Sequence, residues 1–193
     1  FLAEDEGWAL YDHASAAAAR GPCLEIGGYC GKSTLYLGAA CQAGGGVLYS
    51  VDHHRGSEEQ QPGEDYFDPD LFDQEAGRVD SFREFRRTLA RAGLEDCVIP
   101  VVAPSELAAR HWNTPLALLF IDGGHSRAAV EADYRAWTPH LMAGGVLAMH
   151  DIFADPEDGG QAPYEIYQMA TESGLFEALP MVRSLGLLRR LGD

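Results

Sequence analysis

The stretch from Cys23 to Thr34, CLEIGGYCGKST, constrains the fold of this chain more than any other segment. Its first four residues are apolar apart from Glu25 and favour a short buried strand. Gly27, Gly28 and Gly31 follow, and because they have no Cβ, a ligand can approach their backbone closely. The residues after Gly31 favour a helix. The stretch therefore predicts a strand, a glycine turn and a helix, with a ligand at the turn.

A second acid indicates which kind of ligand the glycine turn would bind. Asp52 follows the next predicted strand, 47–51, and stands 27 positions after Glu25. An acid at the tip of a second strand suits the two hydroxyls of a ribose. The turn fits neither phosphate motif, because Ile26 stands where a P-loop requires its first glycine and Tyr29 where a dinucleotide fingerprint requires its second. A cofactor with a ribose and a zwitterionic tail but no phosphate remains, which describes S-adenosylmethionine.

Three motifs carry a resemblance to a known family. The run Glu25–Gly31 resembles the first motif of class I S-adenosylmethionine-dependent methyltransferases, especially that of catechol O-methyltransferase. The runs Phe120–His125 and Gly144–Asp151 resemble bacterial methyltransferases that modify natural-product sugars. The resemblance extends from about Leu10 to Leu191. It implies an α/β fold, a Rossmann-like seven-stranded, mostly parallel sheet with helices on both faces and a C-terminal antiparallel hairpin, in a single domain over 1–193.

The order of apolar segments agrees with that fold, because predicted strands alternate with predicted helices. The predicted strands are 23–26, 47–51, 98–102, 117–121 and 146–149, with a closing antiparallel pair at 176–182 and 185–190. The predicted helices are 2–19, 33–41, 81–92, 128–141 and 163–173.

One long acidic segment, 53–80, follows the second strand, at the sheet edge where open α/β sheets bind ligands. A loop of this length in a compact domain is usually functional or disordered. Two interpretations stay open: a solvated acidic insertion, or a lid in which Tyr66, Phe67 and Phe72 close over the substrate.

The resemblance also assigns cofactor roles. Glycines of the turn would line the methionine end of the cofactor, Glu25 and Ser33 would bond its amino or carboxylate group, and Tyr29 would lie near the sulfonium. Asp52 would hold the ribose, and Ser105 would stand near the adenine unless it is only the N-cap of the next helix. The full predicted set is Glu25, Gly27, Gly28, Tyr29, Gly31, Ser33, Asp52, Ser105 and Asp122.

Acids and a histidine at two neighbouring strand ends suggest a metal site. Asp122 ends one strand, and His150 and Asp151 end the next, so their side chains should converge. In the resembled O-methyltransferases these positions hold a divalent metal, usually magnesium. An imidazole ligand would instead favour manganese, iron or zinc, and we expect magnesium or manganese here. The alternative is that the two acids orient loops and His150 packs at the sheet edge.

His125 is the candidate catalytic base. It follows Asp122 by three residues, where the resembled catechol enzyme has a lysine and the sugar-modifying enzymes a histidine. A histidine with a pKa near neutrality suits removal of a hydroxyl proton. The alternative is a helix cap or a structural hydrogen bond.

These assignments predict O-methylation of a small hydroxylated molecule by in-line methyl transfer from S-adenosylmethionine, assisted by a metal. Two alternatives stay open. The protein could bind S-adenosylmethionine or S-adenosylhomocysteine without catalysis. It could also be an iron-dependent, hydroxylase-like protein, because acids with a histidine also suit non-haem iron.

Composition limits the partners and the compartment. Lys and Arg number 14 against 30 Asp and Glu, a net charge of −16 that argues against nucleic acid and anionic membranes. No C-x-x-C pair and no long apolar run are present, so we expect a cytoplasmic protein with reduced cysteines. The N-terminal helix and the acidic loop are candidate interfaces of a homodimer.

Overall fold

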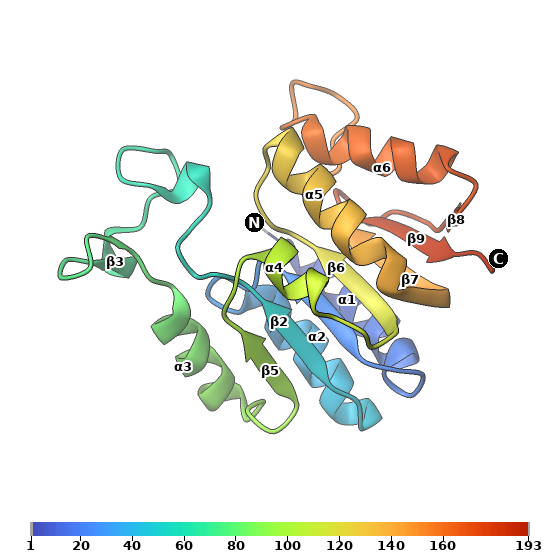
Figure 1. The fold of residues 1–193 in the computed structure, drawn as a ribbon, viewed down its shortest axis with the longest axis horizontal. Helices are drawn as coiled ribbons and strands as arrows, with labels where there is room; N and C mark the ends of the chain where they lie inside the picture. The colour runs from blue at the N-terminus through green and yellow to red at the C-terminus, as the bar shows by residue number, and fades with distance from the viewer. Residues whose placement is uncertain (1, 193) are drawn as a thin grey trace.

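The computed structural model describes residues 2–192, in which a seven-stranded sheet has the order β5-β2-β1-β6-β7-β9-β8 (Figure 1). Strands β5, β2, β1, β6 and β7 run parallel to one another, and β9 and β8 complete the sheet antiparallel to their neighbours. This is the predicted Rossmann-like arrangement. The strands are β1 (Cys23–Ile26), β2 (Leu48–Val51), β5 (Val98–Val101), β6 (Leu116–Ile121), β7 (Leu141–Met149), β8 (Phe176–Ala178) and β9 (Gly186–Arg190).

Helices cover both faces of the sheet, as Figure 1 shows. The helices are α1 (Glu4–Ala18), α2 (Lys32–Gly44), α3 (Phe82–Ala92), α4 (Ser105–Arg110), α5 (Arg127–Trp137) and α6 (Ala162–Glu172). Helices α1, α2 and α3 pack on one face and α4, α5 and α6 on the other. No helix within residues 2–192 is long and apolar enough to span a bilayer.

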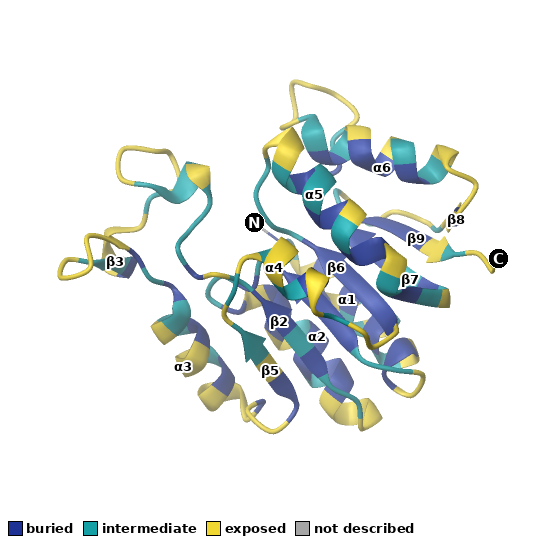
Figure 2. Ribbon diagram, in the orientation of Figure 1, coloured by how far each residue is buried: buried dark blue, intermediate teal, exposed yellow. Residues whose placement is uncertain are grey.

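Strand β6 explains why the sheet is covered on both sides. All six of its residues are buried, whereas the outer faces of the helices are exposed (Figure 2). Leu118 and Phe120 belong to the core beneath α1 and α2, and Leu119 and Ile121 belong to the core beneath α5 and α6. A parallel strand buried on both faces needs this continuous apolar run rather than an alternating one.

The topology leaves a crevice between the carboxyl ends of β1 and β6. The chain moves outward from β1 through β2 to β5, then returns to β6 and continues through β7. Open α/β sheets bind ligands where the strand order reverses in this way. Gly27 lies there with φ +90°, and a Cβ at this position would overlap the carbonyl oxygen of Asp122. The crevice therefore depends on a glycine at the end of β1.

Several element boundaries differ from the sequence prediction: α2 continues to Gly44 rather than ending at 41, and β8 ends at Ala178 rather than at 182. Two further differences have local causes. Helix α5 ends at Trp137 rather than at 141, and the 3-10 turn Thr138–His140 follows. Pro139 accounts for this, since its ring and missing N–H disfavour a continuing helix. Strand β7 begins five residues before the predicted 146, and its pairing with β6 shifts register near Leu116, which is typical of a bulge.

The acidic segment 53–80 forms an ordered loop whose two ends are joined. It contains the 3-10 turns Glu58–Gln60 and Pro69–Leu71 and a small hairpin of β3 (Phe72–Asp73) and β4 (Arg78–Val79). His54 is 1% exposed, and its Nδ1 shares a hydrogen bond of 2.8 Å with the Ser81 hydroxyl. The joined ends explain how a long polar segment stays beside the sheet edge.

Removing the Ser81 hydroxyl should loosen this loop. In Ser81→Ala, buried His54 loses a hydrogen-bond partner, which lowers the stability of the closed loop by about 1–2 kcal/mol. We expect amide hydrogen exchange across residues 55–80 to accelerate by about tenfold, while the exchange of β6 stays unchanged. Ser15→Ala is the matched control, because the buried Ser15 hydroxyl has no hydrogen-bond partner among the described residues. Equal exchange in the two variants would contradict the prediction.

Candidate functional site

Asp52 fixes the glycine turn between β1 and α2 by a hydrogen bond to its backbone. One carboxylate oxygen of Asp52 accepts a hydrogen bond from the Tyr29 N–H at 2.8 Å, and the other accepts from the His54 N–H at 2.7 Å. Tyr29 has φ +44°, a left-handed conformation that a non-glycine residue rarely adopts. Asp52 therefore joins the turn to the beginning of the acidic loop.

Glu25 lies beneath the turn, fully buried. Its carboxylate accepts hydrogen bonds from the Ser33 hydroxyl at 2.9 Å and from the Thr34 hydroxyl. Burial raises the pKa of Glu25 to about 7, against the opposing effect of those hydrogen bonds. Through these hydrogen bonds Glu25 orients the first turn of α2. Ser33 lines the adjoining cavity, whereas Glu25 does not reach it.

A cavity of about 720 Å³ opens along the carboxyl edge of the sheet. This size is typical of small-molecule sites. One end contains the glycine turn and Asp52, and the other contains acids and histidines beyond β6 and β7. The lining includes Leu2, Gly27, Gly28, Tyr29, Ser33, Asp52, Glu58, Glu59, Tyr66, Ser105, Asp122, Gly124, His125, Asp133, His150, Asp151, Phe153 and Asp158.

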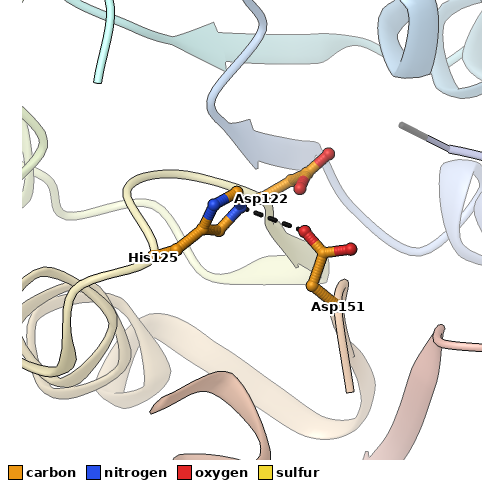
Figure 3. A group of neighbouring side chains, drawn as sticks. All are labelled: Asp122, His125 and Asp151. Carbon is orange, nitrogen blue, oxygen red and sulfur yellow. Dashed lines mark ion pairs between the residues drawn. The ribbon is translucent and has the colours of Figure 1, made fainter. Parts of the chain in front are cut away.

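Asp122, His125 and Asp151 converge on the side of this cavity that lies beyond β6 and β7 (Figure 3). Asp122 follows β6, and Asp151 follows β7 with a left-handed φ of +58°. One ligand atom from each of the three residues lies within 4.8 Å of the other two. Two carboxylates and one imidazole at this separation can hold a divalent cation.

His125 lies between two carboxylates. Its Nε2 is 3.0 Å from Asp151 Oδ2, and its Nδ1 is 2.9 Å from Glu59 Oε2. The hydrogen bond to Asp151 raises the pKa of His125 to about 9, with a smaller contribution from Glu59 and against the effect of burial. His125 therefore carries a proton at neutral pH in this arrangement. Glu59 comes from the acidic loop, 66 residues away along the chain.

His150 lies behind the two aspartates, at the end of β7. Its Nδ1 is 3.3 Å from Asp122 Oδ1 and 3.3 Å from Asp151 Oδ1, and its Nε2 is 3.1 Å from Glu6 Oε2. Burial lowers the pKa of His150, but the hydrogen bonds to Asp122 and Asp151 outweigh it and raise the pKa to about 11. The sequence predicted Asp122, His150 and Asp151 as the ligand set, whereas the convergent group contains His125 as its histidine. The role of His150 as a metal ligand stays a prediction.

Ser105 and Asp133 form a polar corner of the same cavity. Ser105 is the first residue of α4, and its hydroxyl accepts a hydrogen bond from the Trp137 indole at 2.8 Å. The N-cap position belongs to Pro104, so the alternative prediction of Ser105 as an N-cap is wrong. Burial raises the pKa of Asp133 to about 6, against a hydrogen bond from Ser105.

Most of the predicted site residues meet at this cavity. Gly27, Gly28, Tyr29, Ser33, Asp52, Ser105, Asp122, His125, His150 and Asp151 line it. Of the residues described, Glu25 and Gly31 are the two predicted ones that do not, because Glu25 lies beneath the turn and Gly31 faces Thr88.

Three acids that contact predicted site residues were not predicted themselves. Glu59 lies in the acidic segment 53–80, but the sequence does not distinguish it from the other acids of that segment. Asp133 had a signal, since it lies on the buried stripe of α5 with Val130 and Trp137. Glu6 had none, because its contact with His150 spans 144 positions.

Comparison with known families identifies the domain. Residues 24–152 match a family model described as a methyltransferase domain. The match runs from the second residue of β1 to three residues past β7, so it includes the glycine turn and all three residues of the convergent group.

Solved structures with the same fold are numerous, and three of them share 16 to 20% identity with this chain. Cofactor-bound Rv0187 from MTB has a TM-score of 0.72 at 20% identity, covering 100% of this chain and 83% of that one. The O-methyltransferase TomG from Streptomyces achromogenes, in complex with SAM, has a TM-score of 0.68 at 16% identity, covering 100% and 82%. An O-methyltransferase from Bacillus cereus in complex with SAH has a TM-score of 0.69 at 16% identity, covering 100% of this chain and 83% of that one.

The buried Glu25 should make stability depend on pH. Its pKa rises from 4.5 to about 7 on folding, so the folded state holds a proton that the unfolded state releases between these values. Stability should fall as pH rises from about 4.5 to 7, by roughly 3 kcal/mol. Glu25→Gln should remove this pH-dependent part of the free energy of unfolding. Urea unfolding at pH 5 and pH 8 measures it. Glu172→Gln, an exposed acid on α6, is the control, and an unchanged pH dependence in Glu25→Gln would contradict the assignment.

Proposed function

The chain belongs to this methyltransferase family, and from that premise we propose that it transfers a methyl group from S-adenosylmethionine to an oxygen of a small hydroxylated molecule. One observation carries the proposal. A single cavity joins the glycine turn and Asp52 at one end to Asp122, His125 and Asp151 at the other. A cofactor and an acceptor could lie in it end to end.

The cofactor end suits a nucleoside with a short zwitterionic tail. Gly27 and Gly28 leave their backbone open to the ligand, and the Ser33 hydroxyl lies at the beginning of α2. Each Asp52 oxygen already accepts one backbone N–H and has a further lone pair for a ribose hydroxyl. The fold neighbours reported with SAM or SAH support this cofactor.

The acceptor end fits a divalent cation. Asp122 and Asp151 offer the hard carboxylate oxygens that magnesium and manganese prefer, and His125, which is needed as the base, lies beside them outside the ligand set. Such a cation, when bound, lowers the pKa of a hydroxyl that it holds.

His125 would take the proton of the acceptor hydroxyl. It lines the cavity beside both aspartates, and Glu59 holds its other nitrogen. A base must be neutral to act, and the pKa of His125 is about 9. The neutral fraction therefore grows as pH rises toward that value. The rest of the acceleration would come from holding the methyl group in line between sulfur and oxygen.

His125→Gln tests the base. We expect kcat/KM of the unmodified protein to rise with pH up to about 9. The variant should lose about 10²–10⁴-fold in rate and most of this pH dependence, while keeping its affinity for S-adenosylhomocysteine. His111→Gln, at an exposed position after α4, is the matched control. Unchanged turnover in His125→Gln would remove the base from this mechanism.

Calorimetric titration tests the cofactor and the cation separately. Chelator-treated protein should bind S-adenosylhomocysteine with micromolar affinity, and manganese should release heat that Asp122→Ala/Asp151→Ala abolishes. Asp155→Ala, an exposed acid in the loop before α6, should retain that heat. No binding of S-adenosylhomocysteine would overturn the proposed function. Cofactor binding without methylation of any hydroxylated acceptor would favour the non-catalytic alternative.

A further inference from the structure

Glu6 is a buried acid that reaches the site from α1. It is 2% exposed. One carboxylate oxygen accepts hydrogen bonds from the Ser184 N–H at 2.9 Å and the Ser184 hydroxyl at 2.7 Å. The other accepts from the Ala3 N–H at 2.7 Å and lies 3.1 Å from His150 Nε2. With four contacts from three segments of the chain, this carboxylate has a fixed orientation.

His150 transmits this orientation to the candidate cation site. His150 is 5% exposed, and its ring packs edge-on against Phe120, with centroids 6.5 Å apart. The nitrogen opposite Glu6, Nδ1, lies 3.3 Å from an oxygen of Asp122 and 3.3 Å from an oxygen of Asp151. Rotating the ring would break the contact with Glu6 and both contacts with the aspartates at once.

We propose that Glu6 is a positioning residue of the cation site, which acts through His150 to hold the Asp122 and Asp151 carboxylates at the separation that a divalent cation requires. The inference rests on the cation-assisted form of the proposed function. Two neighbouring carboxylates repel each other and would otherwise separate. A carboxylate on the far nitrogen fixes the orientation of histidines that bind metals, and its loss typically weakens metal binding 10- to 100-fold. Glu6 fixes His150 in the same way, with the aspartates between His150 and the cation.

A purely structural role for Glu6 is the competing explanation. Its bond to the Ala3 N–H stabilises the beginning of α1, and an acid in the first turn favours a helix. Asp5 provides the comparison, because it lies in the same turn and carries the same charge. Asp5 is exposed and pairs with Arg183 rather than with His150.

The experiment compares Glu6→Gln with Asp5→Asn by titrating each chelator-treated protein with Mn²⁺ and following the free-ion signal by electron paramagnetic resonance. We expect Glu6→Gln to weaken Mn²⁺ binding about 10- to 100-fold. Asp5→Asn should change it by no more than about twofold, since it removes equal charge without touching His150. Affinity for S-adenosylhomocysteine without metal should be the same in all proteins.

A double-mutant cycle with His150→Gln establishes whether Glu6 acts through the ring. Glu6→Gln should weaken Mn²⁺ binding in the His150 protein and have almost no further effect in the His150→Gln protein. Equal effects in both backgrounds, or Mn²⁺ affinity unchanged by Glu6→Gln, would overturn the inference while leaving the proposed function standing. Absence of Mn²⁺ binding in the unmodified protein would overturn both the cation-assisted mechanism and the inference.

Ser184→Ala covers the case in which Glu6→Gln does not fold. This variant removes the 2.7 Å hydrogen bond from the Ser184 hydroxyl but keeps the bond from the backbone N–H. We expect a smaller loss of Mn²⁺ affinity, about threefold, because one neutral hydrogen bond to the carboxylate disappears. Unchanged affinity in folded Ser184→Ala and unchanged affinity in folded His150→Gln would together contradict the proposal.

Discussion

The close approach of the β1 and β6 backbones determines where the site can lie. Hydrogen bonds continue past the strand ends, from Gly27 N–H to Val51, from Asp122 N–H to Ile26 and from His150 N–H to Ile121, at 3.1, 3.0 and 3.1 Å. Four of the five parallel strands, β2, β1, β6 and β7, therefore end at one level. Gly27 lets the turn pass against the carbonyl of Asp122, where any Cβ would overlap it. The glycine turn, Asp122 and His150 then line one crevice.

Alternation of charge explains how this crevice holds so many acids. From α1 outward the side chains run Glu6, His150, the aspartate pair, His125 and Glu59, each within 3.3 Å of the next. Burying a carboxylate without a partner would cost several kcal/mol, whereas each acid here faces an imidazole. The two histidines carry protons because of these neighbours. A chain with a net charge of −16 thus places two protonated imidazoles, buried His150 and half-buried His125, among the acids of the cavity.

The sequence predicted what depends on local pattern. The parallel strands, the closing antiparallel pair and the glycine turn follow from apolar runs and turn residues, and the acids at the ends of β6 and β7 follow from strand order. The place of His125 in the convergent group could not be read in this way. Both His125 and His150 follow strands closely and both contact Asp151, and how each ring lies against the aspartates depends on side-chain direction. Glu6 and Glu59 enter through contacts that span 144 and 66 positions, which no local pattern encodes.

The acidic loop connects the two ends of the cavity. At its beginning, Asp52 accepts one N–H from the glycine turn and one from His54, so the turn and the loop share a carboxylate. Further along, Glu59 reaches His125 at the opposite end. Tyr66 also lines the cavity, whereas Phe67 and Phe72 pack on each other with centroids 5.9 Å apart. The loop is therefore a wall of the site as well as a solvated surface. A ligand that displaced Glu59 from His125 would change the loop and the proton affinity of the imidazole together, since one hydrogen bond serves both.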